Sequence, residues 1–277
     1  MKEPGRVLFV NSEIMPYVPQ TQQSIIGRYL PQGILEQGKE IRSFMPRYGC
    51  INERRNQLHE VIRLSGLNIV VNDVDRPLVI KVASITAARM QVYFIDNEDY
   101  FRRKAMYCDA DGNFFEDNGQ RAVFFARGVL ETVKKLRWKP DIIHCNGWLS
   151  HLLPLYLKKA YKNDPIFSDS KIVLSLYDED PTFKLEADFK SNILMPGVKN
   201  KDIDKLEQAN GIHLAKLAIQ YSDGIIYGSG SLHPEIEKAV ADSALPVLPY
   251  KEIGLEEKEY VIEYNRFFDS IIGTDEE

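Results

Sequence analysis

Apolar residues along the chain follow two spacings, and their alternation predicts an α/β protein. Short, continuously apolar runs are typical of strands buried on both faces of a parallel sheet, whereas apolar residues three and four apart are typical of helices that pack on such a sheet. The first run, residues 6–11 (RVLFVN), is followed by a helical pattern from Ile25 to Leu35 and a second strand-like run at 39–45. The chain therefore opens with a β-α-β unit, for which a right-handed crossover is expected.

The same alternation continues to the end of the chain. The remaining apolar runs indicate strands at 141–145, 171–176 and 224–227, and helices near 120–136, 149–161, 202–221 and 234–241. Three β-rich runs at 67–71, 77–84 and 90–95 predict an antiparallel meander at one edge. We expect a Rossmann-like, doubly wound, mainly parallel sheet that binds ligands at the carboxyl ends of its strands. No linker divides the chain, so residues 1–277 are predicted to form one domain, closed by an amphipathic helix within 253–277.

Charge and composition exclude several classes of partner. The 40 acidic and 35 basic side chains are spread evenly and give a net charge of −5, which argues against nucleic acid and anionic membranes as partners. The apolar run at 7–10 is too short for a signal peptide, and no run approaches the roughly 18 residues of a membrane span. Three cysteines without C-x-x-C spacing suit a reducing compartment. The sequence therefore predicts a cytoplasmic protein.

Common cofactor motifs are absent from the sequence. It contains neither G-x-G-x-x-G nor a P-loop, and its five histidines lack metal-ligand spacing, so we expect no cofactor and no metal. The turn Gly228–Ser231 could hold an anion, but a tight strand-to-helix turn with a nearby cap is the favoured interpretation. His144 lies at the end of a predicted strand and Trp148 follows it, where chemistry or sugar stacking would occur, and core packing is an equally good interpretation of both.

Five collinear segments resemble one enzyme family. They are Val7–Tyr17 (VLFVNSEIMPY), Met45–Gly49 (MPRYG), Val92–Phe101 (VYFIDNEDYF), residues 111–125 with their D-G-N and D-N-G-Q-R elements, and Trp138–Trp148 (WKPDIIHCNGW). Together they are similar to the N-terminal domain of bacterial glycogen and starch synthases, retaining glucosyltransferases that extend α-1,4-glucans from ADP-glucose. The resemblance implies a GT-B architecture, in which two Rossmann-like domains face a cleft. The first domain mostly holds the glucan acceptor and the second mostly holds the nucleotide sugar.

The resemblance also identifies candidate cleft residues. An α-glucan or a malto-oligosaccharide is the ligand that it implies for them. Asp117 and Asn118 with Arg121 could equally form a helix N-cap and a structural ion pair. The residues that match family positions near or supporting the cleft are Glu13, Tyr48, Asp96, Asn97, Asp117, Asn118, Arg121, His144 and Trp148.

Other positions depart from the family pattern. Pro19, Thr21 and Gln22 replace the lysine and two glycines of the family's K-T-G-G loop, whose charge and N–H groups approach the phosphates. Proline has no N–H, and β-branched threonine resists the positive φ that glycine allows. Leu149 stands where the family has a cleft histidine, and S-L-Y-D at 175–178 stands where it has T-I-H-N. We therefore assign no catalytic residue and no residue that binds a sugar nucleotide.

The sequence also lacks the R-x-x-x-Q-K and E-P-x-G-L elements of the family's second domain. Because a phosphoryl leaving group needs positive charge and exclusion of water, we expect the chain alone to be impaired in transfer. Three hypotheses follow. The chain is a glucosyltransferase half completed by a separate synthase chain, a non-catalytic relative (a pseudoenzyme) that binds glucan or regulates a synthase, or an assembly protein that forms a homodimer.

Overall fold

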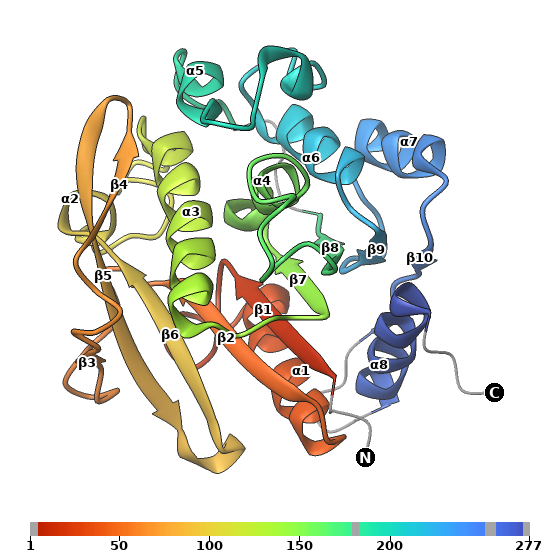
Figure 1. Cartoon of the computed structure of the whole chain (residues 1–277), viewed down its shortest axis with the longest axis horizontal. Coiled ribbons are helices and arrows are strands. Elements are labelled where there is room, and N and C mark those ends of the chain that lie inside the picture. Colours follow the sequence, from red (N-terminus) through yellow and green to blue (C-terminus); the bar gives the residue numbers. More distant parts are fainter. Residues whose placement is uncertain (1–4, 179–182, 253–258, 274–277) are drawn as a thin grey trace.

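A single mainly parallel sheet runs through the computed structural model, which describes residues 5–178, 183–252 and 259–273 (Figure 1). In these residues the strand order is β10-β9-β8-β7-β1-β2-β6-β5-β3, and β4 pairs with β5. Neighbours from β10 to β6 are parallel, and β5 is antiparallel to β3, β4 and β6. The strands are β1 (Arg6–Asn11), β2 (Glu40–Pro46), β3 (His59–Glu60), β4 (Leu67–Val71), β5 (Val74–Ile85), β6 (Met90–Asp96), β7 (Ile142–Asn146), β8 (Lys171–Leu176), β9 (Gly224–Tyr227) and β10 (Val247–Leu248).

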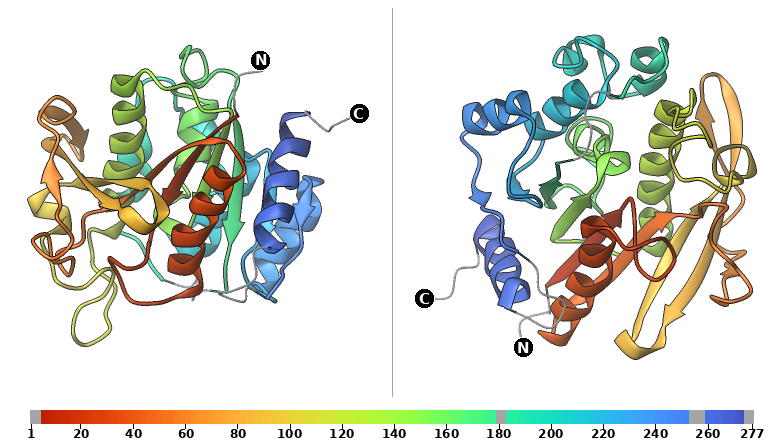
Figure 2. Two further views of the ribbon diagram at one scale, coloured as in Figure 1. Left: turned by 90° about the horizontal axis from the view of Figure 1, so that it is seen from below. Right: turned by 180° about the vertical axis from the view of Figure 1, so that it is seen from behind.

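Helices cover both faces of this sheet (Figure 2). On one face α1 packs on β1 and β2 while α8 contacts α1 and β8, and on the other face α3, α4 and α6 lie side by side. The central strands β1 and β7 are therefore buried along almost their whole length, which explains their continuous apolar runs. The helices are α1 (Gln22–Glu36), α2 (Glu98–Phe101), α3 (Asn118–Leu136), α4 (Leu153–Lys158), α5 (Phe189–Ile193), α6 (Gly211–Gln220), α7 (Pro234–Ser243) and α8 (Glu259–Ile272).

The strand order reverses at β1, which lies between β2 and β7. The chain leaves β1 toward β2 on one side and later returns to build β7 on the other side. Such a switch point opens a crevice beyond the carboxyl ends of the two strands, and ligands of doubly wound sheets bind there. In this protein Glu13 follows β1 at that point, and Gly147 and Trp148 follow β7.

The predicted fold class is confirmed, and several details differ. The meander β4-β5-β6 is antiparallel as expected, but β6 also pairs with β2, so it continues the main sheet. The short strand β3 lies in a charged stretch with no apolar signal. The helix predicted at 202–221 is α6 alone, because the Asn210 side chain accepts a hydrogen bond from the N–H of His213 and caps a helix there. The predicted closing helix is α8, and residues 253–258 and 274–277 lie outside the described residues.

Among the described helices, none is both long and apolar enough to cross a bilayer. The turn Gly228–Ser231 leads into α7, whose N-cap is His233, and Nδ1 of that residue accepts a hydrogen bond from the N–H of Glu235. This agrees with the interpretation of the segment as a capped turn.

Candidate functional site

A cavity of about 580 Å³ opens at the switch point, beyond the carboxyl ends of the central strands. Residues from the segments that follow β1, β7, β8 and β9 line it, together with the start of α1 and the loop between α2 and α3. The lining residues are Glu13, Thr21, Gln22, Gln23, Tyr107, Cys108, Gly112, Phe114, Trp148, Tyr177, Asp178, Phe183 and Ser229.

Aromatic rings form one wall of this cavity. Phe114 and Phe183 are stacked, with centroids 4.5 Å apart and planes at 20°. Trp148 packs against both, at 5.3 Å from Phe114 and 5.0 Å from Phe183, and the ring of Tyr107 lies 5.4 Å from Trp148. These four rings, which we call the aromatic wall, offer flat apolar surface with polar edges at Tyr107 and Trp148.

The polar part of the cavity lining is organised around Glu13, next to the aromatic wall. Its Oε2 accepts a 2.6 Å hydrogen bond from Thr21 Oγ1, and its Oε1 accepts a 3.1 Å bond from the hydroxyl of Tyr107. Burial raises the pKa of Glu13 above its usual value, and these two hydrogen bonds oppose that shift. Thr21 is also the N-cap of α1, and its Oγ1 accepts from the N–H of Ser24 at 3.0 Å. The hydroxyl of Thr21 is therefore bonded both to the first turn of α1 and to a carboxylate.

No basic side chain reaches the cavity from the described residues that line it. The charged groups there are the carboxylates of Glu13 and Asp178. The hydroxyl of Ser229 already takes part in a hydrogen bond with the backbone, because its Oγ accepts from the N–H of Asp178 at 2.8 Å. A phosphate would meet negative charge here without a compensating cation, so the cavity suits an uncharged ligand.

The positions that depart from the family pattern have structural roles. The carbonyl oxygen of Pro19 accepts a 3.0 Å hydrogen bond from Ser24 Oγ. Leu149 is fully buried and does not line the cavity, and its backbone N–H donates to Ser12 Oγ at 3.2 Å. Nearby, His151 is buried, and burial lowers its pKa to about 3. Neither residue presents an acid or base to the cavity.

Two of the predicted cleft residues, Glu13 and Trp148, line the cavity. A third predicted residue, Tyr48, lies behind the cavity lining. Tyr48 is buried, and its hydroxyl donates to the carbonyl oxygen of Ser12 at 2.9 Å and lies 3.2 Å from the hydroxyl of Tyr107. Tyr48 thus contacts the cavity lining without reaching the cavity.

Asp117, Asn118 and Arg121 form a second supporting cluster. Nδ2 of Asn118 donates to the carbonyl oxygen of Tyr107 at 2.8 Å, and Nη1 of Arg121 donates to Asn118 Oδ1. Asp117 is the N-cap position of α3 and forms an ion pair with Arg103. Asp117 thus stands at the N-cap position, but among the described residues its side chain makes no cap hydrogen bond, and its ion pair is with Arg103 and not with Arg121.

The remaining predicted residues lie elsewhere. His144 is fully buried among the rings of Phe9, Tyr264 and Phe268, its Nε2 lies 2.7 Å from Ser175 Oγ, and burial lowers its pKa to about 3. The core interpretation of His144 fits this position.

Asp96 and Asn97 lie at the end of β6, outside the cavity lining. Asp96 forms ion pairs with Arg47 at 3.0 Å and Lys81 at 3.1 Å. Asn97 caps α2, and its Nδ2 donates to the carbonyl oxygen of Pro77 at 2.9 Å. Both residues fix the local structure at the end of this strand.

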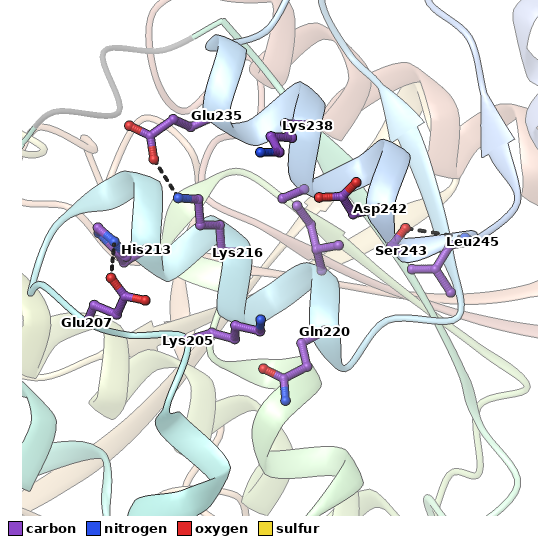
Figure 3. A pocket seen from close by; sticks show the side chains of 12 residues that line it. Lys205, Glu207, His213, Lys216, Gln220, Glu235, Lys238, Asp242, Ser243 and Leu245 are labelled. Carbon is purple, nitrogen blue, oxygen red and sulfur yellow. Dashed lines mark hydrogen bonds and ion pairs between the residues drawn. The ribbon is translucent and has the colours of Figure 1, made fainter.

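A second cavity of about 550 Å³ lies between α6 and α7 (Figure 3). Lys216 forms a 2.5 Å ion pair with Glu235, and His213 Nε2 lies 3.9 Å from Glu207. Charges of both signs line this cavity, and its described lining includes no Phe, Tyr or Trp. It offers no flat surface for a sugar ring.

Comparison with known proteins places these observations in a family. The sequence profile described as the starch synthase catalytic domain matches residues 6–248. A glycogen synthase of Chlorobium limicola is 40% identical over 174 residues, 62% of this chain and 36% of that protein. A glycogen synthase of Chlorobaculum parvum is 32% identical over 238 residues, 83% of this chain and 47% of that protein. The chain thus spans between about a third and a half of the length of these relatives.

A solved structure has the same fold. The catalytic domain of starch synthase IV from Arabidopsis thaliana, bound to ADP and acarbose, superimposes with a TM-score of 0.65 at 18% identity. The match covers 80% of this chain and 44% of the Arabidopsis chain.

Proposed function

The chain belongs to the starch synthase catalytic domain family, and from that premise we propose that it binds an α-glucan in the cavity at the switch point without itself transferring glucose from a sugar nucleotide. One observation carries the proposal. The cavity lining combines a wall of four aromatic rings with amides, hydroxyls and carboxylates, and it has no basic side chain among its described residues.

Such a lining complements a neutral oligosaccharide. The axial C–H groups of a glucose ring give it apolar faces, while its hydroxyls lie around the rim. Aromatic rings cover the faces, and Gln22 and Asp178 line the cavity, where their side chains can exchange hydrogen bonds with the rim. The volume of about 580 Å³ lies within the range typical of small-molecule sites.

Transfer from a sugar nucleotide makes a different demand on the site. Charge develops on the departing diphosphate, and a site that stabilises it supplies cations or free N–H groups. In this chain the capped start of α1 is bonded to the Glu13 carboxylate instead. The side chain of Leu149 is apolar and fully buried, so it can form no hydrogen bond with a transferred sugar. These features support binding without catalysis.

Calorimetry with the purified chain tests both halves of the proposal. We expect maltoheptaose to bind and ADP to give no heat, and we expect no glucose to pass from ADP-glucose to glycogen. Phe183→Ala removes one half-buried ring of the stacked pair and should weaken maltoheptaose binding by about ten-fold or more. Tyr29→Ala, which removes a half-buried ring of α1 that does not line the cavity, should leave binding unchanged.

The outcomes are separable. Absence of maltoheptaose binding, or equal binding by the Phe183 and Tyr29 variants, would refute the glucan site. Incorporation of glucose into glycogen by the chain alone would refute the loss of transfer and leave the glucan site standing.

A further inference from the structure

Another cavity, of about 780 Å³, lies at the amino ends of β2 and β6, away from the cavity at the switch point. The pairing of these two parallel strands begins at Ser43 and Val92, so the residues that precede this pair diverge, toward the lower edge of Figure 1. The hairpin β5-β6 stays paired as far as Ile85 and Met90. Residues of β2, of this hairpin and of the end of α1 line the opening between the strands, which we call the notch.

Arg42 of β2 lines the notch and is held in place by an aromatic ring. Its guanidinium carbon lies 5.6 Å from the ring centre of Trp138. Trp138 is itself anchored, because only 8% of its surface is exposed and its Nε1 donates a 3.1 Å hydrogen bond to Glu40 Oε2. A guanidinium that stacks on a ring keeps its N–H groups available to an acceptor. Arg42 is therefore a preorganised cation.

A second arginine, Arg89, lines the same notch and is exposed. Neither Arg42 nor Arg89 forms a hydrogen bond or an ion pair within the part of the chain that the structure describes, and the terminal nitrogens of Arg42 are not among its shielded atoms. Glu40, the acidic residue of the described lining, is already paired with Arg6 at 3.1 Å. The positive charges of Arg42 and Arg89 therefore remain in excess.

The rest of the lining suits an organic molecule. Leu35, Ile85 and Met90 contribute apolar surface, and Thr86 and Gln91 contribute a hydroxyl and an amide. The volume of about 780 Å³ lies within the range typical of small-molecule sites. The notch can thus hold a ligand that has both an anionic group and an apolar part.

Two unmatched guanidinium groups favour a dianion. A phosphate monoester carries about −1.5 to −2 charges at pH 7 and has three acceptor oxygens, and arginine binds such a group through two parallel N–H bonds. A neutral saccharide would leave both charges without a counterpart. The notch and the cavity at the switch point therefore call for different ligands.

We propose that the notch binds a small phosphate monoester, whose phosphate contacts Arg42 and Arg89 and whose organic group lies on the apolar residues. The notch shares no lining residue with the cavity at the switch point. The inference is therefore independent of the proposed glucan binding.

Phenyl phosphate is the probe, titrated by calorimetry at about 0.15 M salt, where long-range attraction between exposed charges is screened. It should bind the wild-type chain more tightly than inorganic phosphate does, because the apolar lining covers its ring. Arg89→Asn should weaken binding by about ten-fold or more through loss of one charge-assisted contact. Asparagine tolerates the φ of +52° at this position, so the variant should fold. Arg42→Met should weaken binding by a similar factor.

Arg137→Asn is the matched control, because Arg137 is also an exposed arginine with a φ of +51° and does not line the notch. It should bind phenyl phosphate as the wild type does, and equal weakening by Arg89→Asn and Arg137→Asn would assign the binding to overall charge and overturn the proposal. Absence of phenyl phosphate binding would overturn it too, and competition by succinate at equal concentration would replace the phosphate with a dicarboxylate. Both notch variants should leave maltoheptaose binding unchanged, and a loss of it in either would contradict the independence of the two sites.

Discussion

The carbonyl oxygen of Met106 accepts a 2.7 Å hydrogen bond from the guanidinium group of Arg121, a side chain that is fully buried. The ring of Phe101 lies 5.1 Å from the same guanidinium. Together with Asn118, Arg121 holds the backbone of residues 106 and 107, so that Tyr107 faces Glu13 and Trp148. Arg121 and Asn118 are therefore positioning residues for the cavity.

Asn118→Ala tests this support. The substitution leaves the carbonyl oxygen of Tyr107 and one N–H of Arg121 without their partner in a buried setting, so we expect the free energy of unfolding to fall by about 2–3 kcal/mol. Maltoheptaose binding should weaken as well, because Tyr107 loses its anchor. Urea denaturation and calorimetry measure the two effects. Asn113→Ala, at an exposed asparagine in the loop that precedes α3, should change the stability by less than about 1 kcal/mol.

Gly147→Ala separates backbone strain from steric conflict. Alanine at position 147 is strained by the φ of +88°, and its Cβ also meets Gln23 and Ser12. Gly38 has a similar φ of +89° with no atom within 4 Å of its Cβ position, so Gly38→Ala reports the strain alone, about 1–2 kcal/mol. We expect Gly147→Ala to lower the melting temperature further than Gly38→Ala and to weaken maltoheptaose binding. Equal shifts for both variants would contradict the close packing at Gly147.

Glu186 makes the stability of the fold depend on pH. Its Oε2 accepts a 2.9 Å hydrogen bond from the N–H of Gly119 in the first turn of α3, yet burial raises the pKa of Glu186 from 4.5 to about 7. Between these values the folded state holds a proton that the unfolded state has released. The free energy of unfolding should therefore fall as pH rises from 4.5 to about 7, by at most about 3 kcal/mol from this group.

The measurement for Glu186 compares urea denaturation at pH 5 and pH 8. Glu186→Gln has no titrating proton, so the difference between the two pH values should shrink by the amount that Glu186 contributes. A wild-type difference that the glutamine variant retains in full would assign the pH dependence to other groups.

Thr21→Ala tests the cap at the start of α1. The substitution removes the acceptor for the N–H of Ser24 and the donor to Glu13, and we expect a loss of about 1–2 kcal/mol in the free energy of unfolding. Thr21→Ser keeps the hydroxyl and should retain most of the stability. If the serine variant is as unstable as the alanine variant, the hydroxyl is not the stabilising group.

The fold was largely predictable because its strands are buried on both faces. The runs at β1, β7 and β8 are continuous apolar segments, and such runs carry a strong local signal. The strand β3 could not be predicted, because two exposed residues gain their strand conformation only by pairing with β5. The residues around positions 59 and 60 carry no apolar pattern that would indicate this pairing.

The candidate site was predictable only in part. Glu13 and Trp148 follow central strands, and the resemblance identified both. Phe114 and Phe183, by contrast, lie in irregular segments far apart in the sequence, and only the tertiary fold stacks them. For His144, the sequence could not show that its side chain points toward α8, since that depends on which helix covers the strand.

The position of α8 has a consequence for how the protein is made. Phe268 packs against Phe9 of β1 and against His144, and Lys39, just before β2, donates to Asn265 of the same helix. The strand that leaves the ribosome early is therefore covered by a helix that leaves it late. While residues 259–272 are still inside the exit tunnel, the part of this face that α8 covers lies open to water, and we expect a growing chain at that stage to need protection by chaperones.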